Sequence, residues 1–357
     1  MESTSRKKIL NICGSMNQTT MLHQISMHLS DYDSYFSPYY ADGFIGKIAQ
    51  THLLDFSVLG GQFRERTIKY LRSNKLNIDF GGKLNNYDIV IICSDLVVPK
   101  NILNKRVILV QEGMTDPENF IYYLVKGLDL PRWLASTSTT GLSDCYDKFC
   151  VASDGYKELF IRKGIKPEKI VVTGIPNFDN CKQYLDNDFP YKNFVLVATS
   201  DMRETYKYEN RKKFIKRAVK IANGRQLIFK LHPNEFIERA TQEINMYAPG
   251  ALVYSQGKTE EMIANCNVLI TRYSSVVFVG LALGKEVYSE FDLGELKKLM
   301  PLQNGGISSY NIAMVVEELL KTEKEKALIP FRKKPAYGLN KLLQKIKQKR
   351  KWANIKS

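Results

Sequence analysis

The stretch at residues 268–284, VLITRYSSVVFVGLALG, constrains the fold of this chain most strongly. Residues 268–271 are four β-prone residues in which apolar and polar side chains do not alternate, which predicts a short buried strand. Residues 276–283 are apolar enough to pack on a sheet as a helix, and Gly284 is the expected stop. A strand that leads through a turn into a helix is the unit from which parallel sheets are built, so we expect an α/β fold.

The turn inside this stretch contains Ser274 and Ser275, either of which is a suitable N-cap for the helix. A helix start combines unpaired backbone N–H groups with the positive end of the helix dipole. Together with two hydroxyls, these groups suit a phosphate. An ordinary capped strand-helix unit without any ligand explains the same residues, so the stretch alone leaves both interpretations open.

The length of the chain, 357 residues, is long for a single hydrophobic core and predicts two domains. Apolar residues make up 44% and charged residues 25%, which is ordinary globular composition. No run of about 18 apolar residues occurs, so we expect no segment that spans a bilayer. The apolar run after the basic N-terminus is too short for a signal peptide, which predicts a cytoplasmic protein.

The cysteines are scattered along the chain without a CxxC pair. They are Cys13, Cys93, Cys145, Cys150, Cys181 and Cys266. Several lie in strand-like apolar runs, so we expect reduced core residues and no metal site.

Strands separated by helix-length segments predict a parallel, doubly wound sheet in the N-terminal half. The expected strands are residues 8–13, 87–93, 106–110, 148–152 and 169–173. A helix is expected at about 154–163. Residues 32–80 are aromatic-rich and mixed, and no order of elements follows from them.

The strand at 8–13 ends in a polar loop that contains Gly14, Ser15, Asn17 and Gln18. Open α/β sheets bind ligands beyond the C-terminal ends of their strands, so this loop is a candidate binding loop. It does not match GxGxxG, and a dinucleotide site is therefore not expected.

The strand at 106–110 runs straight into Gln111, Glu112 and Gly113. A carboxylate at the C-terminal edge of a strand, followed by a glycine that permits a sharp turn, is well placed to act on a ligand. Glu112 is therefore the candidate general base. The alternative is a structural loop glutamate that accepts hydrogen bonds from neighbouring N–H groups.

A second parallel sheet is expected in the C-terminal half. Its strands are predicted at residues 194–199, 226–231, 251–254 and 268–271, with helices at 208–223 and 259–265. His232 follows the second of these strands and precedes Pro233, so its ring should be held at the sheet edge. Residues 174–177, together with residues 186–190, have the composition of an interdomain linker, and we expect domains at 1–177 and 178–330.

Residues 331–357 account for ten units of the net charge of the chain, which is +15 in total. Ten basic and no acidic residues lie there: Arg332, Lys333, Lys334, Lys341, Lys345, Lys347, Lys349, Arg350, Lys351 and Lys356. Leu339, Leu342 and Ile346 fall at helical spacing, and Trp352 follows. A basic amphipathic helix of this kind suits an anionic membrane surface, or less well a nucleic-acid backbone. Alternatively, its leucines pack on the body and its lysines remain in water.

Three motifs carry a resemblance to known enzymes: Gln111-Glu112-Gly113, Lys230-Leu231-His232-Pro233 and Tyr273-Ser274-Ser275. They resemble the acidic-acidic-Gly, His-Pro and Ser-Ser motifs of bacterial sialyltransferases, polysialyltransferases and capsule Kdo transferases. That resemblance implies the GT-B fold, in which two Rossmann-like domains face each other across a cleft, and CMP-activated acidic sugars as donors.

The resemblance extends coarsely over residues 8–320. Residues 270–287, ITRYSSVVFVGLALGKEV, are also similar to CDP-glycerol glycerophosphotransferases and to non-hydrolysing UDP-N-acetylglucosamine 2-epimerases. Gln111 departs from the sialyltransferase pattern, because an acid is usual there. The Gln-Glu pair is closer to the motif of β-Kdo transferases, which leaves the sugar open.

The chemistry of sugar transfer assigns roles to these residues. A base must take the proton of the acceptor hydroxyl, a role that contributes about 10²- to 10⁴-fold in rate, and Glu112 fills it. His232, Ser274 and Ser275 can stabilise the phosphate charge of the leaving nucleotide without a metal, so no cofactor is expected. Lys230 and Arg272 are either additional charges at this site or strand-end residues turned to solvent.

We therefore expect a glycosyltransferase with an N-terminal acceptor domain and a C-terminal donor domain. It would act on a cell-surface glycan or glycolipid at the inner face of the cytoplasmic membrane. The alternatives are a CDP-glycerol-type polyol-phosphate transferase and a 2-epimerase-like enzyme. Nucleic acid is not expected as a partner, because no RNA- or DNA-binding motif accompanies the charge.

Overall fold

The computed structural model describes residues 6–43, 46, 59–204 and 208–322. The chain folds into two compact units. Unit 1 combines Met1–Cys150, Phe160–Val171 and Ile312–Ser357, and unit 2 combines Val151–Leu159 and Val172–Asn311. The predicted basic helix at 331–357 lies outside the described residues.

Unit 1 is built on a six-stranded sheet with the order β2-β1-β3-β4-β5-β6. The strands are β1 (Lys8–Cys13), β2 (Asp33–Pro38), β3 (Ile89–Ile92), β4 (Arg106–Val110), β5 (Lys148–Val151) and β6 (Ile170–Val172). Pairs from β2 through β5 are parallel, with Ile9 beside both Ser34 and Ile89. The chain moves from β1 outward to β2 and then returns to β3 on the other side. The strand order therefore reverses between β1 and β3, where open sheets bind ligands.

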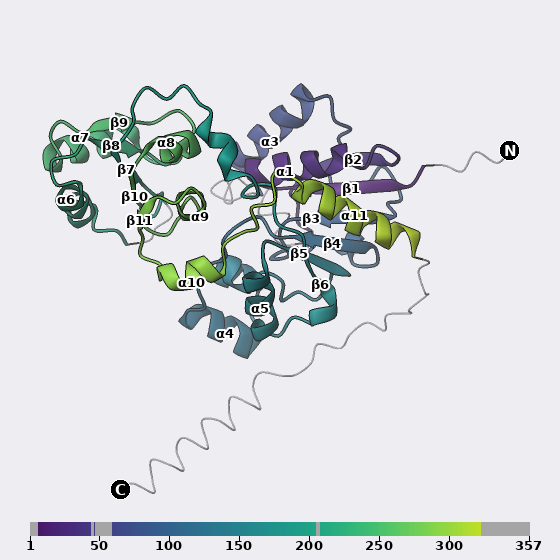
Figure 1. Cartoon of the computed structure of the whole chain (residues 1–357). Coiled ribbons are helices and arrows are strands. Elements are labelled where there is room, and N and C mark those ends of the chain that lie inside the picture. Colours follow the sequence, from purple (N-terminus) through teal and green to yellow (C-terminus); the bar gives the residue numbers. More distant parts are fainter. Residues whose placement is uncertain (1–5, 44–45, 47–58, 205–207, 323–357) are drawn as a thin grey trace, which may run out of the picture. The chain divides into compact units, whose positions relative to one another are not determined.

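Helices cover both faces of this sheet. On one face, α1 (Met16–Met27), α3 (Gly61–Ser73) and α11 (Ser308–Lys321) share a buried core with alternate strand residues (Figure 1). Ile89 and Ile91 are two of these inward-facing residues. On the other face, α5 (Asp154–Lys163) places Phe160 against Phe149 of β5, with ring centroids 4.6 Å apart. This two-sided burial explains why the strands are almost continuously apolar.

Unit 2 contains a five-stranded sheet with the order β11-β10-β7-β8-β9. Its strands are β7 (Val195–Ala198), β8 (Leu227–Lys230), β9 (Leu252–Tyr254), β10 (Val268–Ile270) and β11 (Glu286–Tyr288), and all neighbours are parallel. The chain starts at β7, moves out to β9 and returns to β10 on the other side. The strand order of this sheet therefore reverses between β7 and β10.

The helices of unit 2 also lie on two faces. Helices α6 (Arg211–Ala222) and α7 (Ile237–Tyr247) share one core with alternate residues of β7, β8 and β10. Helix α9 (Val277–Ala282) packs on the opposite face at Gly280. A Cβ atom at Gly280 would lie 2.7 Å from Cδ2 of Leu269 and 3.0 Å from Cγ2 of Val287, so the glycine lets the helix lie close to the sheet.

Further helices complete the described part of the chain. They are α4 (Phe120–Leu128), α8 (Thr259–Asn265), α10 (Leu293–Lys298), and the short 3-10 helices η1 (Lys100–Ile102), η2 (Arg132–Thr139), η3 (Pro167–Lys169) and η4 (Cys181–Leu185). Every helix in the described part of the chain is too short or too polar to cross a lipid bilayer.

The expected parallel α/β architecture with two Rossmann-like domains is confirmed. The predicted helix at 208–223 begins later, at Arg211, because Asn210 caps it by accepting a hydrogen bond from the N–H of Lys213 at 3.0 Å. The segment at 32–80, for which no order was predicted, contains β2 and α3. The assignment of an acceptor domain at 1–177 and a donor domain at 178–330 stays a prediction.

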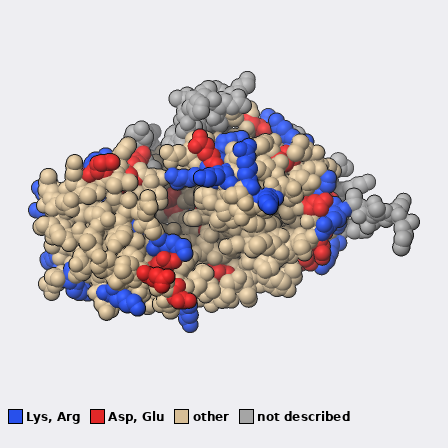
Figure 2. Space-filling view, turned by 90° about the horizontal axis from the view of Figure 1, so that it is seen from above, with Lys and Arg blue, Asp and Glu red and all other residues tan. Residues whose placement is uncertain are grey.

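Charges of both signs lie on the surface. On the face shown in Figure 2, Lys and Arg side chains are interspersed with Asp and Glu. All six cysteines are free, and each except Cys145 is buried, as expected for reduced core residues.

Candidate functional site

The loop after β1 is the first part of the site in unit 1. Ser15 is the N-cap of α1, and its side chain accepts a hydrogen bond from the N–H of Gln18 at 3.2 Å. This cap satisfies one of the amide groups that the helix start leaves unpaired. The hydroxyl hydrogen of Ser15 stays available for a second bond.

That hydroxyl donates to Glu112, which follows β4. The Oγ of Ser15 lies 2.6 Å from Oε1 of Glu112, and Nε2 of Gln18 donates to the other carboxylate oxygen. Two residues of the predicted binding loop and the predicted general base therefore form one cluster. They meet because β1 and β4 end at the same edge of a parallel sheet, with only β3 between them.

Burial raises the pKa of Glu112, while the hydrogen bonds from Ser15 and Gln18 lower it to a smaller extent. Burial also raises the pKa of the Cys93 thiol well above its usual value, and the charge of Glu112 adds to this effect. A carboxylate with a raised pKa is a stronger base than an exposed one. The environment of Glu112 therefore suits proton abstraction, which the sequence alone could not show.

The other two predicted residues of the loop are Gly14 and Asn17. A Cβ atom at Gly14 would lie 2.0 Å from Oε1 of Gln18, so the glycine leaves room for the Gln18 side chain. The carbonyl of Gly14 accepts a hydrogen bond from Thr67 of α3 at 3.0 Å. Asn17 is exposed, and its carbonyl accepts from Thr20 at 3.2 Å.

Gln111 has a structural role beside the cluster. Its side chain is buried and donates from Nε2 to the carbonyl of Gly113 at 2.7 Å, which closes the turn around Glu112. An amide can donate this bond and a carboxylate cannot. The amide at position 111, where the resemblance leads us to expect an acid, is therefore used by the turn itself.

In unit 2, His232 and Pro233 follow β8 at the sheet edge, as predicted. The backbone N–H of His232 donates to both Thr199 and Glu235 at 3.0 Å. Its ring is partly exposed, with Nδ1 accepting from the N–H of Asn234 at 3.3 Å. The same nitrogen lies 3.8 Å from Oδ2 of Asp201, so the other ring nitrogen, Nε2, is the one left for a ligand.

The predicted N-cap at Ser274 or Ser275 is wrong. Helix α9 has its N-cap at Val276, without a side-chain cap, and contains only six residues. The chain enters the helix through a tight turn, in which the carbonyls of Ser274 and Ser275 accept from Val277 and Phe278 at 3.3 and 3.0 Å. The backbone of the two serines therefore makes the turn. The predicted stop at Gly284 is correct, because its φ of +66° lies in the left-handed region.

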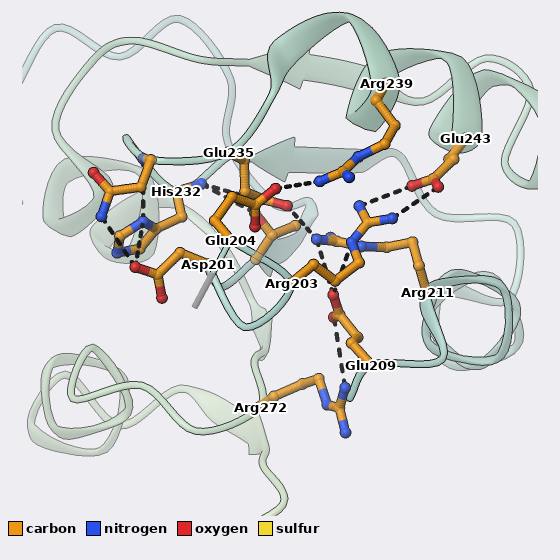
Figure 3. Close-up of polar contacts among 12 residues, drawn as sticks. Asp201, Arg203, Glu204, Glu209, Arg211, His232, Glu235, Arg239, Glu243 and Arg272 are labelled. Atoms are coloured by element: carbon orange, nitrogen blue, oxygen red, sulfur yellow. Dashed lines mark hydrogen bonds and ion pairs between the residues drawn. The ribbon is translucent and has the colours of Figure 1, made fainter. Parts of the chain in front are cut away.

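A buried ionic cluster lies at the same sheet edge and was missed by the sequence prediction (Figure 3). The carboxylate of Glu209 is fully buried, and three arginines lie around it: Arg203, Arg211 and Arg272. Arg272 is therefore not turned to solvent, which was one of two interpretations of this residue. Lys230 is also buried, and its Nζ donates to the carbonyl of Ser255 at 3.1 Å.

One signal for this cluster was present in the sequence. Helix α6 begins with Arg211, Lys212 and Lys213 and has no acidic residue in its first turn. Cations at a helix start oppose the helix dipole, so a run of them there indicates a purpose other than helix stability. The position at the β7/β10 reversal is the second indication, and it required the strand order.

Comparison with known proteins addresses the fold. No protein-family model and no curated protein matches the sequence. Among solved structures, UDP-GlcNAc 2-epimerase from Neisseria meningitidis, bound to UDP-GlcNAc, is 13% identical over 88% of this chain and 100% of its own, with a TM-score of 0.53. A Listeria monocytogenes structure, provisionally assigned as a UDP-N-acetylglucosamine 2-epimerase, is 12% identical over 90% of this chain and 98% of its own, with a TM-score of 0.56.

The chain has a GT-B-like fold. The wall teichoic acid polymerase TagF, in a structure with CDPG, also aligns, at 12% identity over 88% of this chain and 89% of its own, with a TM-score of 0.49. The fold rests on the two structures with TM-scores of 0.53 and 0.56. At 12 to 13% identity they show the fold and not the reaction.

Among the described residues, no group of three or more His, Cys, Asp or Glu side chains is arranged to hold a metal ion. The structure does show a buried, hydrogen-bonded carboxylate in unit 1. In unit 2 it shows a group of arginines, one of which is linked to the backbone of His232 through Glu235.

Proposed function

We propose that this protein is a glycosyltransferase that moves a sugar from a nucleotide-activated donor to a hydroxyl of a cell-surface glycan or glycolipid. The observation that carries the proposal is the geometry of Glu112. Its carboxylate lies at the C-terminal edge of β4, accepts hydrogen bonds from Ser15 and Gln18, and has a pKa raised by burial. A positioned carboxylate of this kind can take the acceptor proton as the new bond forms.

The donor is proposed to bind unit 2. His232 presents a ring at the end of β8, and Arg272, Ser274 and Ser275 follow β10. Cationic and hydroxyl groups at this edge can stabilise the charge that develops on a leaving phosphate, and no metal is needed for that task. The motifs that resemble CMP-sugar enzymes lie on these loops, which favours a CMP-linked acidic sugar such as Kdo or sialic acid.

The acceptor is proposed to lie at the anionic face of the cytoplasmic membrane. The chain has a net charge of +15, and helix α4 with the segment after it exposes a group of large apolar side chains: Phe120, Ile121, Tyr123, Leu124, Leu128, Leu130, Trp133 and Leu134. Exposed patches of this kind mark interaction surfaces. Phe and Leu beside Trp and Tyr, on a basic protein, suit an anionic lipid interface. Phe120 follows Glu112 by only eight positions in the chain.

The runner-up is a polyol-phosphate transferase of the CDP-glycerol type, since the same phosphate-binding edge would serve a different transferred group. A 2-epimerase-like enzyme is the other alternative, and it has the fold in common with this chain. The membrane-facing features above favour transfer to a lipid-linked acceptor over epimerisation of a free nucleotide sugar.

A donor panel tests the proposal. The full-length protein is incubated with CMP-Kdo, CMP-sialic acid, CDP-glycerol and UDP-GlcNAc, with and without EDTA, and the released nucleotide is measured together with any change in the sugar. We expect CMP release from a CMP-sugar that persists in EDTA and increases with a glycan acceptor. Glycerol-phosphate transfer from CDP-glycerol, or conversion of UDP-GlcNAc to its 2-epimer, would replace the proposal by the corresponding alternative.

A further inference from the structure

Glu209 has an unusual set of neighbours. Its Oε2 lies 3.2 Å from Nη2 of Arg211 and 3.5 Å from Nε of Arg203, and its Oε1 lies 3.6 Å from Nη1 of Arg272. None of these contacts is a hydrogen bond, and neither carboxylate oxygen has a hydrogen-bond partner among the described residues. The side chain is nevertheless fully buried.

The same arginines make well-formed contacts elsewhere. Arg203 binds Glu243 through two parallel hydrogen bonds of 2.8 and 2.9 Å, and Nη2 of Arg211 donates to Glu235. Glu235 also accepts from the backbone N–H of His232 at 3.0 Å, so its carboxylate is fixed from two sides. These two glutamates hold the arginines in place. Glu209 is held loosely by comparison.

Several N–H groups remain unpaired around Glu209. Nε of Arg203, Nε and Nη1 of Arg211, and Nη1 of Arg272 have no hydrogen-bond partner in the described structure. Arg211 is 4% exposed, so water does not readily take their place there. Burying a charge without hydrogen bonds costs free energy. In a structural ion pair, additional hydrogen bonds normally offset that cost. The cluster therefore has an incomplete set of bonds that a better-fitting anion would complete.

The position of the cluster is that of a ligand site. Arg272 follows β10, and Arg203 and Glu209 follow β7, so the group lies at the reversal of strand order. Arg272 directly precedes Tyr273-Ser274-Ser275, and its side chain is 18% exposed. The positive end of the α6 dipole adds to the field at this edge.

We propose that Arg272, supported by Arg203, binds a phosphate group of the nucleotide donor, and that Glu209 is an internal anion which occupies this arginine site when no phosphate is present. The inference rests on the proposed function, because it assigns the phosphate contacts of that same donor site. A phosphate offers oxygens in the fork geometry that guanidinium groups match, whereas one carboxylate cannot reach all the unpaired N–H groups at once. Donor affinity is then set by competition with Glu209.

Calorimetry on the full-length protein tests this, with CMP as the phosphate-bearing probe and cytidine as its phosphate-free match. Arg272→Ala should weaken CMP at least tenfold and leave cytidine unchanged. Arg272→Lys keeps the charge but loses the planar fork, so an intermediate loss is expected. Glu209→Gln removes the competing charge and should tighten CMP at least threefold. The control is Arg217→Ala, which breaks the exposed pair with Glu290 in the same unit and should change CMP affinity less than twofold.

The outcomes separate the two proposals. CMP affinity within twofold of the parent in Arg272→Ala, or weakened CMP binding by a folded Glu209→Gln protein, would overturn the inference while the transferase proposal stands. If a thermal melt shows that Glu209→Gln does not fold, CMP binding by the two Arg272 variants decides whether the inference stands. A parent protein that binds neither CMP, UMP nor CDP would overturn the proposed function, and the inference with it.

Discussion

The hydroxyl of Ser15 donates to Oε1 of Glu112 at 2.6 Å across 97 positions of sequence. The same oxygen of Ser15 accepts the N–H of Gln18 and so caps α1. A single side chain thus fixes the start of a helix and orients a buried carboxylate that follows another strand. Because capping restricts the rotamer of Ser15, the direction of its bond to Glu112 is set before any substrate binds.

Glu112→Gln should reduce turnover by about 10²-fold or more and leave the donor dissociation constant nearly unchanged. The reason is that a base for the acceptor acts in the transition state, and glutamine keeps the shape while it removes the proton acceptor. Single-turnover rates and calorimetry on one preparation check this. A rate within threefold of the parent would exclude Glu112 from the mechanism.

A melting curve distinguishes a structural role of Glu112 from a catalytic one. Burial raises its pKa, so the folded protein binds a proton more tightly there than the unfolded chain does, and this contribution to stability is lost as pH rises through the folded pKa. Glu112→Gln should therefore not lower the melting temperature at neutral pH. A marked fall with activity per folded molecule retained would instead identify a structural loop residue.

Ser15→Ala should shift the acidic limb of the pH-rate profile to higher pH. The hydrogen bond from Ser15 lowers the pKa of Glu112, so its removal raises that pKa further. Loss of the cap should also cost about 0.5 to 2 kcal/mol of stability. Ser15→Thr retains the hydroxyl and is the control for the pH profile. A lower melting temperature with an unmoved pH profile would show that Ser15 only caps the helix.

Replacing Ser274 and Ser275 together by alanine should weaken CMP binding by about 1 to 3 kcal/mol, the range for hydrogen bonds to a charged group. The backbone carbonyls make the entry turn of α9, and the N-cap is Val276, so the fold should tolerate the change. Calorimetry with CMP measures the effect. Unchanged affinity in a protein that melts like the parent would remove both hydroxyls from the donor site.

Membrane binding should depend on two separate parts of the chain. Deletion of residues 331–357 should lower co-sedimentation with vesicles that contain phosphatidylglycerol, since each basic residue near an anionic surface contributes about 1 kcal/mol. Phe120→Glu with Trp133→Glu should lower it further, because both side chains are exposed. Leu84→Glu changes a side chain that is 71% exposed elsewhere in unit 1 and is the matched control.

Two results of the vesicle assay would contradict this prediction. If truncation leaves the sedimented fraction unchanged, or if the truncated protein unfolds, the tail packs on the body and does not attach the protein to a membrane. If Leu84→Glu and the double variant behave alike, the exposed side chains of α4 and the segment after it do not form a lipid-binding surface.

Lys163 should make stability rise with pH in the alkaline range. Its Nζ is buried, donates to the carbonyl of Ser138 at 2.8 Å, and lies 5.6 Å from the ring centroid of Tyr122. Burial lowers its pKa from 10.5 to about 8, so between these values the unfolded chain binds more protons than the folded one. The melting temperature of the parent should therefore rise relative to that of Lys163→Met as the pH increases over this range. The exposed Lys166→Met is the control, and an equal slope in both variants would contradict the assignment.

Local sequence determined the secondary structure closely where one periodicity dominated. The predicted strand at 106–110 and helices at 154–163 and 259–265 agree with β4, α5 and α8, because each is an apolar or amphipathic run with a clear start and stop. The mixed segment at 32–80 gave no such signal. The cap of α9 was misplaced because two adjacent serines satisfy the same local rule, whereas in the structure their carbonyls make the entry turn and the N-cap is Val276.

The sequence also supplied the residues of the site, but not their neighbours. It marked Glu112, His232 and the loop with Ser15 and Gln18, since strand ends and turns can be recognised locally. Only the tertiary structure joined Ser15 and Gln18 to Glu112, and only it gathered Arg203, Arg211 and Arg272 around Glu209. Those contacts depend on strand order, which is decided by packing between segments far apart in the chain, and periodicity within one segment carries no information about it.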